Sequence, residues 1–185
     1  ERIQHKEELL NQLSQLGKTL LIETDLKSMF ENAVKTLAAI LGVKFSKILE
    51  YQPESDSLVL REGIGWRKGL VGKARVESGL HSLAGYTLYS NQPVIAENLG
   101  TETRFSAQPL LLDHGILSCI SITIPGDNQP FGVLTAHCTR PRTFSHEEVN
   151  LIRFINAGRK RGQRPLSTWT PIMTMSLVLR MNIKA

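Results

Sequence analysis

The sequence predicts an α+β domain in which helices from both ends cover one face of an antiparallel sheet and a long crossover covers the other. Two observations predict it. Two pairs of strand-like segments are separated by an irregular stretch of roughly 50 residues, and helical periodicity comes before the first pair and after the second. The regular alternation of strand and helix that a parallel sheet needs is missing from the pattern.

Length and composition favour one soluble globular domain. The chain has 185 residues, of which 41% are hydrophobic and 21% charged. It contains no apolar run of the roughly 18 residues that a membrane span needs, and it does not start with a signal peptide. We therefore expect a cytoplasmic domain without membrane insertion. Because it opens with Glu1, we expect it to be cut from a larger protein.

The net charge of +5 comes from the end of the chain. Residues 1–157 hold 16 basic and 17 acidic side chains, whereas residues 158–185 hold six basic and no acidic ones. The body therefore lacks the basic stripe of a nucleic-acid-binding surface. Gly158, Gly162 and Pro165 break a helix, and residues 158–185 are predicted to be a frame-shifted or vector-encoded tail; a divergent basic linker is the alternative.

Residues 1–22 form the first predicted element, a signalling helix. Leucines recur at the a/d spacing of a coiled coil, which predicts a homodimer interface. The alternative is an amphipathic helix packed on its own domain. The four leucines are Leu9, Leu13, Leu16 and Leu20.

A second helix follows, with Asp25 as its N-cap and Gly42 at its end. Its apolar stripe covers about a third of the circumference and is expected to lie on a sheet. The stripe comprises Leu26, Phe30, Ala33, Val34, Leu37 and Leu41.

Two hairpins supply the predicted strands. Residues 43–52 and 57–61 flank a turn at 53–56, and residues 118–124 and 131–138 flank a turn at 126–130. Isoleucines alternate with small polar residues along 118–124, which is typical of a strand buried on one face only.

The stretch between the hairpins is predicted to hold short helices at 83–90 and 107–114 and a short strand at 93–96. Its glycines lack the context of a phosphate-binding loop. Irregular segments this long are uncommon unless they carry function, so we expect a ligand pocket beneath it.

A capping box starts the last helix. Ser145 caps it, Glu148 reaches back, and Phe144 packs on Val149. Val149, Ile152 and Ile155 form its predicted buried stripe.

Catalysis and metal binding are not expected. Cys119 and Cys138 do not form a zinc motif, and both are expected to be buried, reduced thiols. No catalytic triad or carboxylate pair stands out.

From Asp25 to Asn156 the sequence resembles a GAF domain, the small-ligand module of many signalling proteins. No single motif is diagnostic, but their order and spacing are specific. The matching segments are EGIGW at 62–66, LAGYTLYSNQPVIAEN at 83–98, TRFSAQPLLLDHGILSCISITIP at 103–125 and GVLTAHCTRPRTFSHEEVNLI at 132–152.

The resemblance implies a PAS-like antiparallel sheet of about six strands, with the terminal helices on one face and the pocket on the other. It places the GAF domain at residues 23–157. It also implies a sensory domain of a bacterial two-component protein of the sensor histidine kinase type, which relays ligand binding through a helical homodimer. The alternatives are a ligand-free dimerisation module and, less favoured, a GAF-fold methionine-sulfoxide reductase.

Family ligands can be compared with residues. Residues 106–114 contain no cysteine, so a covalent bilin is not expected, and the signature of the cyclic-nucleotide-binding members is absent after Phe105. His114 is either a haem ligand or, as we favour, a helix-end hydrogen-bonding residue. No cofactor is assigned. The candidate ligand-binding residues are Trp66, Tyr86, Arg104, Phe105, Leu111, His114 and Ser118.

Overall fold

The structure is a computed structural model that describes residues 26–90, 92–126 and 128–157. The predicted helix 1–22 with Leu9, Leu13, Leu16 and Leu20, the cap at Asp25, and the tail 158–185 lie outside the described residues. The structure therefore does not test the predictions for these segments.

Six antiparallel strands form one sheet in the order β3-β2-β1-β6-β5-β4. The strands are β1 (Phe45–Gln52), β2 (Ser57–Ile64), β3 (Arg75–Glu77), β4 (Val94–Ala96), β5 (Ser118–Ile124) and β6 (Gly132–Cys138). Both predicted hairpins are confirmed, since β1 pairs with β2 and β5 with β6. β1 also pairs with β6, which joins the two hairpins into a single sheet.

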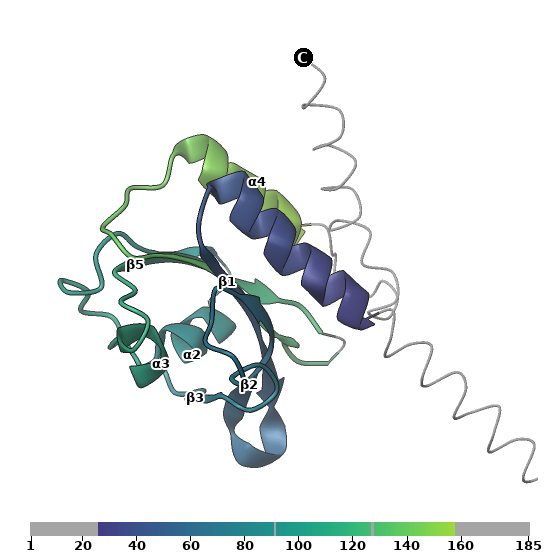
Figure 1. Cartoon of the computed structure of the whole chain (residues 1–185). Coiled ribbons are helices and arrows are strands. Elements are labelled where there is room, and N and C mark those ends of the chain that lie inside the picture. Colours follow the sequence, from purple (N-terminus) through teal and green to yellow (C-terminus); the bar gives the residue numbers. More distant parts are fainter. Residues whose placement is uncertain (1–25, 91, 127, 158–185) are drawn as a thin grey trace, which may run out of the picture.

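Two helices cover one face of the sheet (Figure 1). The first spans residues 26–41 and ends where Gly42 adopts a φ of 59°, as its sequence predicts. The second, α4 (His146–Ala157), begins at the predicted capping box: the Glu148 N–H donates to Ser145 Oγ at 3.2 Å, and the Ser145 N–H donates to Glu148 Oε2 at 2.8 Å.

One apolar core holds these helices on the sheet. Phe30, Val34 and Leu37 from the first helix and Ile152 from α4 are buried with Ile48 of β1. The isoleucines of β5 point into the same core. Burial of this apolar surface is the main force that keeps the helices in place.

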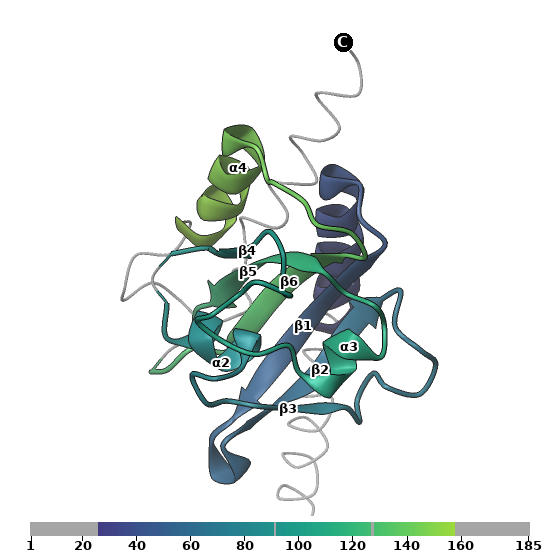
Figure 2. The same cartoon turned by 90° about the vertical axis from the view of Figure 1, so that its left-hand side faces the viewer.

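The crossover covers the opposite face with two short helices, α2 (Leu83–Leu88) and α3 (Pro109–Leu112) (Figures 1 and 2). It also contributes the edge strands β3 and β4, of which β3 has no counterpart in the predicted elements. Gly115 follows α3 with a positive φ of 65°.

The prediction that β5 is buried on one face only was wrong. Cys119 and Ser121 point away from the helices, yet at most 1% of either residue is exposed. The crossover packs on this polar face. The alternation of apolar and polar residues along β5 therefore marks two faces that are both buried, and not one buried and one exposed face.

Candidate functional site

A row of polar side chains crosses the middle of the sheet on the face beneath the crossover. Lys47 on β1 lies opposite Thr135 on β6, and Thr135 lies opposite Ser121 on β5. The hydroxyl oxygens of Ser121 and Thr135 are 2.8 Å apart and share a hydrogen bond. All three residues are at most 3% exposed. Polar side chains buried under a covering segment are unusual in a small core and mark this row as the candidate site.

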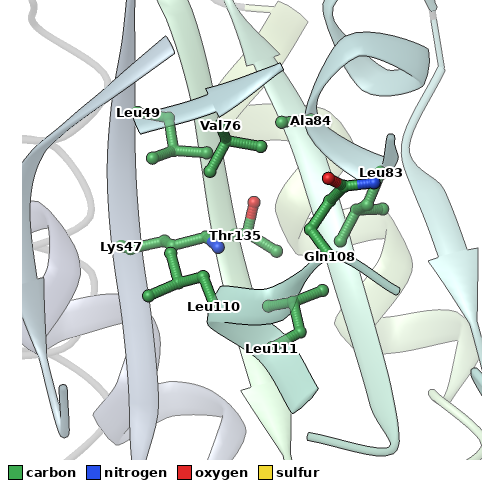
Figure 3. A pocket seen from close by; sticks show the side chains of 9 residues that line it. All are labelled: Lys47, Leu49, Val76, Leu83, Ala84, Gln108, Leu110, Leu111 and Thr135. Atoms are coloured by element: carbon green, nitrogen blue, oxygen red, sulfur yellow. The ribbon is translucent and has the colours of Figure 1, made fainter. Parts of the chain in front are cut away.

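A narrow recess lies above this row (Figure 3). Lys47 and Thr135 form its floor, Leu83 and Ala84 of α2 form one wall, and the cover comes from the α3 region. Its free volume is about 10 Å³, which admits about one water molecule. The remaining lining residues are Leu49, Val76, Gln108, Leu110 and Leu111.

Lys47 is the most unusual group of the site. It is only 3% exposed, and no hydrogen bond or ion pair joins its ammonium to another residue in the described part of the chain. Burial in this poorly solvated position lowers the pKa of Lys47 to about 7. The side chain therefore lies close to the point where charged and neutral forms are equally populated at physiological pH.

Trp66 packs against Lys47 from the side of β2. Its ring centroid lies 4.7 Å from Lys47 Nζ, and its indole N–H donates to the carbonyl of Ser46 at 2.9 Å. The ring can lie this close to the sheet because Gly63, which pairs with Lys47, has no side chain: an added Cβ would come 2.6 Å from Trp66 Cδ1. Gly63 in the sequence EGIGW thus leaves the space that the ring of Trp66 occupies.

His137 lies two residues beyond Thr135 on the same face of β6. It is fully buried, and neither ring nitrogen has a hydrogen-bond partner among the described residues. Burial, with a smaller contribution from the nearby charge of Lys47, holds the pKa of His137 well below its usual value. Trp66 connects the two groups, since its ring centroid is also 5.3 Å from that of His137.

Cys119 faces the same side as this pair. Burial raises the pKa of the Cys119 thiol to about 12, although the charge of Lys47 acts in the opposite direction. Cys138, the other free cysteine, belongs to the core on the helix-bearing face. The two thiols therefore lie on opposite sides of the sheet.

The predicted ligand-binding residues fall into three groups. Leu111 lines the recess, and Trp66 and His114 lie beside it in edge-to-face contact, with ring centroids 4.9 Å apart. The His114 Nδ1–H donates to the Leu110 carbonyl at 2.8 Å, and Nε2 accepts from the Arg67 N–H at 3.1 Å. Both ring nitrogens of His114 are therefore already hydrogen-bonded to the backbone of the crossover.

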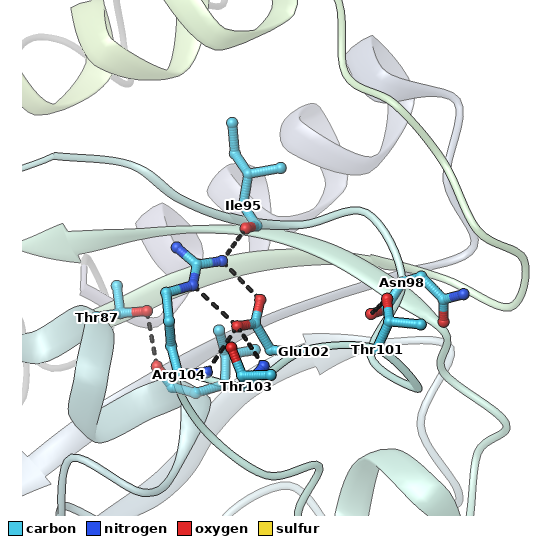
Figure 4. Close-up of polar contacts among 8 residues, drawn as sticks. Thr87, Ile95, Asn98, Thr101, Glu102, Thr103 and Arg104 are labelled. Atoms are coloured by element: carbon cyan, nitrogen blue, oxygen red, sulfur yellow. Dashed lines mark hydrogen bonds and ion pairs between the residues drawn. The ribbon is translucent and has the colours of Figure 1, made fainter.

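Tyr86, Phe105 and Arg104 form a second cluster beside β4. Figure 4 shows the contacts of Arg104 with Glu102 and with Ile95 of β4. Arg104 pairs with Glu102 at 2.6 Å and lowers the pKa of that carboxyl group to about 2. Arg104 also donates to the Ile95 carbonyl. Its guanidinium is therefore engaged in fixing the crossover onto the sheet edge.

Ser118 lies on the other face of β5, because it alternates with Cys119. Its hydroxyl donates to the Arg140 carbonyl at 2.8 Å. The structure therefore does not bring Ser118 to the recess. A ligand-binding role for any of the seven residues stays a prediction.

Sequence reasoning missed Lys47, Thr135 and His137. A lysine and a histidine inside otherwise apolar strands were the available signal, since FSKILEYQ and GVLTAHC place them on the same side as inward-facing residues. This signal can be interpreted only when it is known which face of the sheet the crossover covers.

Comparison with known proteins identifies the family. The GAF domain family model matches residues 25–156, and the chain belongs to this family. No curated protein matches the sequence significantly. In the described residues, no helix is both long and apolar enough to cross a bilayer.

Solved GAF structures share the fold at low identity. One is the GAF domain of a phosphoenolpyruvate-protein phosphotransferase from Coxiella burnetii, with a TM-score of 0.62, 16% identity, and 86% of this chain and 87% of that chain covered. Another is a domain of a putative two-component sensor histidine kinase from Sinorhizobium meliloti 1021 (TM-score 0.54, 13% identity, 83% and 90% covered).

A third similar structure is an enzyme, the free methionine-R-sulfoxide reductase from Neisseria meningitidis in complex with its substrate. Its TM-score is 0.59 at 16% identity, and the match covers 92% of this chain and 89% of that one. At these identities the likeness establishes the fold and leaves the chemistry to the residues of each chain.

Proposed function

We propose that this GAF domain is a regulatory sensor that binds a small molecule between the sheet and the crossover and relays binding through its helices to an output domain such as a histidine kinase. The observation that carries the proposal is the buried, unpaired Lys47 at the recess, since buried polar groups without partners are rare outside functional sites. The sensor kinase domain among the similar structures supports the type of output.

The central strands provide the relay. On β1, Lys47 and Leu49 face the recess, whereas Ile48 between them packs on the helices. β6 repeats this arrangement with Thr135 and Leu134. A ligand that shifts these strands, or favours one packing of them, therefore acts directly on the core that seats both helices. It must bind one arrangement more tightly than the other.

Entry of a ligand requires movement of the cover. The free space admits about one water molecule, so Gln108 and Leu110, which are half-buried at the rim, must turn outward. α3 contributes only four residues and can shift without breaking the sheet. A cytoplasmic homodimer that transmits the shift through residues 1–22 completes the proposed mechanism.

Hydrogen–deuterium exchange tests the proposal after a metabolite library has been screened by native mass spectrometry. A true ligand should slow exchange in residues 107–114 and also change exchange in the helix 26–41, which it does not touch. Protection confined to an exposed loop such as residues 67–73 would contradict the proposal.

The narrowness of the recess favours one alternative, a ligand-free GAF domain that only dimerises. That alternative predicts that no compound raises the melting temperature, while the oligomeric state depends on residues 1–22. Analytical ultracentrifugation of the chain with and without those residues distinguishes the two functions.

A further inference from the structure

The face of the sheet beneath the crossover carries basic side chains without acidic partners. This excess of basic groups indicates the class of ligand that the recess would bind. Lys47 carries a basic group into the recess, and His137 adds a second basic group beside it. The titratable groups around them are Cys119 from β5 and, through the Trp66 ring, His114 from the crossover. None of these groups is a carboxylate.

No acidic side chain lines the recess, and four acidic groups of the described chain are engaged elsewhere. Glu102 pairs with Arg104, Glu148 with Arg142, and Glu50 with Arg61. Asp56 accepts hydrogen bonds from Ser78 and Tyr51 at the far end of the first hairpin. The site therefore has no internal counter-ion for Lys47, and a buried cation without one is costly.

The donors at the recess suit a group that only accepts hydrogen bonds. The Lys47 ammonium offers three N–H donors, the Thr135 hydroxyl can donate while it accepts from Ser121, and the Gln108 amide stands at the rim. Leu83 and Leu111 leave an apolar side. Carboxylates and other oxyanions are the acceptor-only groups that bind such donors most strongly.

We propose that the recess is a site for a small carboxylate monoanion, whose oxygens accept hydrogen bonds from Lys47 and Thr135 while its short alkyl part lies against Leu83 and Leu111. The inference rests on the proposed sensor function and names its ligand class. His137 lies two residues further along β6 on the same face, and burial holds its pKa well below the usual value, so it is neutral beside the site at neutral pH.

Proton uptake accompanies binding. Burial has lowered the pKa of Lys47 to about 7, so at pH 8 most free domains hold the neutral amine. A bound carboxylate favours the ammonium and raises its pKa. Binding at pH 8 should therefore take up close to one proton, whereas a neutral ligand should take up none.

Isothermal titration calorimetry at pH 8, in two buffers of different ionisation enthalpy, tests the inference. The probes are acetate and propionate, with acetamide and propionamide as neutral isosteres. We expect the acids to bind with buffer-dependent heats and at least 10-fold more tightly than the amides. Nitrate and inorganic phosphate serve as further arms, and either of them binding more tightly than both acids overturns the carboxylate assignment.

Matched variants locate the site. Lys47→Met keeps the length of the side chain and should abolish carboxylate binding, whereas Lys73→Met, at an exposed lysine, should bind as the wild type does. Thr135→Val preserves shape and should weaken binding several-fold, which keeps the test valid if Lys47→Met fails to fold. Equal binding of acid and amide, or acid binding unchanged in both variants, overturns the inference.

The two proposals fail in different ways. If a screened ligand protects the crossover but binds Lys47→Met as tightly as wild type, the sensor function stands and the carboxylate inference is wrong. If the acids, the amides and the whole library leave the crossover unprotected, both are wrong.

Discussion

The ring centroid of Trp66 lies 4.7 Å from the Nζ atom of Lys47, the lysine on the floor of the recess. The ring faces a group that alternates between amine and ammonium at neutral pH, and its negative face stabilises the charged form. It is held in place by the hydrogen bond from its indole N–H to the Ser46 carbonyl. The properties of the site therefore depend on this pair.

The stability of the ligand-free domain should depend on pH through Lys47. Its pKa is about 7 in the folded chain and near 10.5 when solvated, so between these values the unfolded state binds more protons. Stability should then rise with pH, by about 2 kcal/mol from pH 7 to 9. Urea unfolding at several pH values measures this.

Lys47→Met should remove the rise and should be more stable than wild type at pH 7. Burial raises the pKa of Cys119 from its ordinary value near 9 to about 12, so ionisation of this thiol in the unfolded state opposes the rise near pH 9, but only by about 0.4 kcal/mol. A wild-type stability that is flat or falls between pH 7 and 9 would contradict an unpaired buried lysine.

Gly63→Ala should displace the Trp66 ring. The new Cβ would come 2.6 Å from Trp66 Cδ1 and 3.1 Å from the Ser46 carbonyl, and overpacking of this kind costs ~1–3 kcal/mol. Gly79→Ala is the control, since nothing lies within 4 Å of its added Cβ. Tryptophan fluorescence and thermal unfolding should change in the first variant only; equal behaviour of the two would show that Trp66 does not need the glycine.

Arg142 joins the first helix to α4 on the helix-bearing side of the sheet. It donates to the Leu41 carbonyl at the end of the first helix at 2.7 Å, pairs with the capping residue Glu148 of α4, and lies over Phe144 with 5.0 Å between its Cζ and the ring centroid. Arg142→Ala leaves a half-buried carboxylate and a helix-end carbonyl unpaired and should cost ~1–3 kcal/mol.

Arg140→Ala is the matched control for Arg142→Ala, because Arg140 is exposed and its hydrogen bond to Ser118 uses only the backbone carbonyl. Its stability should stay within ~0.5 kcal/mol of wild type. Similar losses for both variants in chemical denaturation would show that Arg142 does not hold the helices.

The thiols should be inert in the folded chain. Cys119 is fully buried with a raised pKa, and only the thiolate reacts readily. Labelling of the native protein with a disulfide reagent at pH 8 should therefore be far slower than after unfolding. Free methionine sulfoxide should not be reduced; rapid labelling of Cys119 together with turnover that Cys119→Ser abolishes would establish a reductase instead.

Local patterns were enough to predict most of the fold. The stripe from Leu26 to Leu41 predicts its helix, and the Ser145–Glu148 capping box predicts the start of α4, because both rest on neighbours within a few residues. β3 was missed since three residues, Arg75–Glu77, carry too little periodicity to identify a strand.

The site needed the tertiary structure. Lys47 and Thr135 are far apart in the sequence and become neighbours only through the pairing of β1 with β6. The exposed Arg104 was a candidate ligand-binding residue, but Glu102, two positions away, already forms an ion pair with it. The sequence shows which side chains are charged, but the tertiary structure determines which of them form ion pairs and which remain free to bind a ligand.

The direct test of this account is the pKa of Lys47 in the ligand-free domain, measured by NMR from the titration of its ¹³Cε signal and assigned with Lys47→Met. A midpoint near pH 7 is the predicted result. A midpoint near the ordinary lysine value of about 10.5 would show that the ammonium is solvated or paired, and the site would have no charge to offer a ligand.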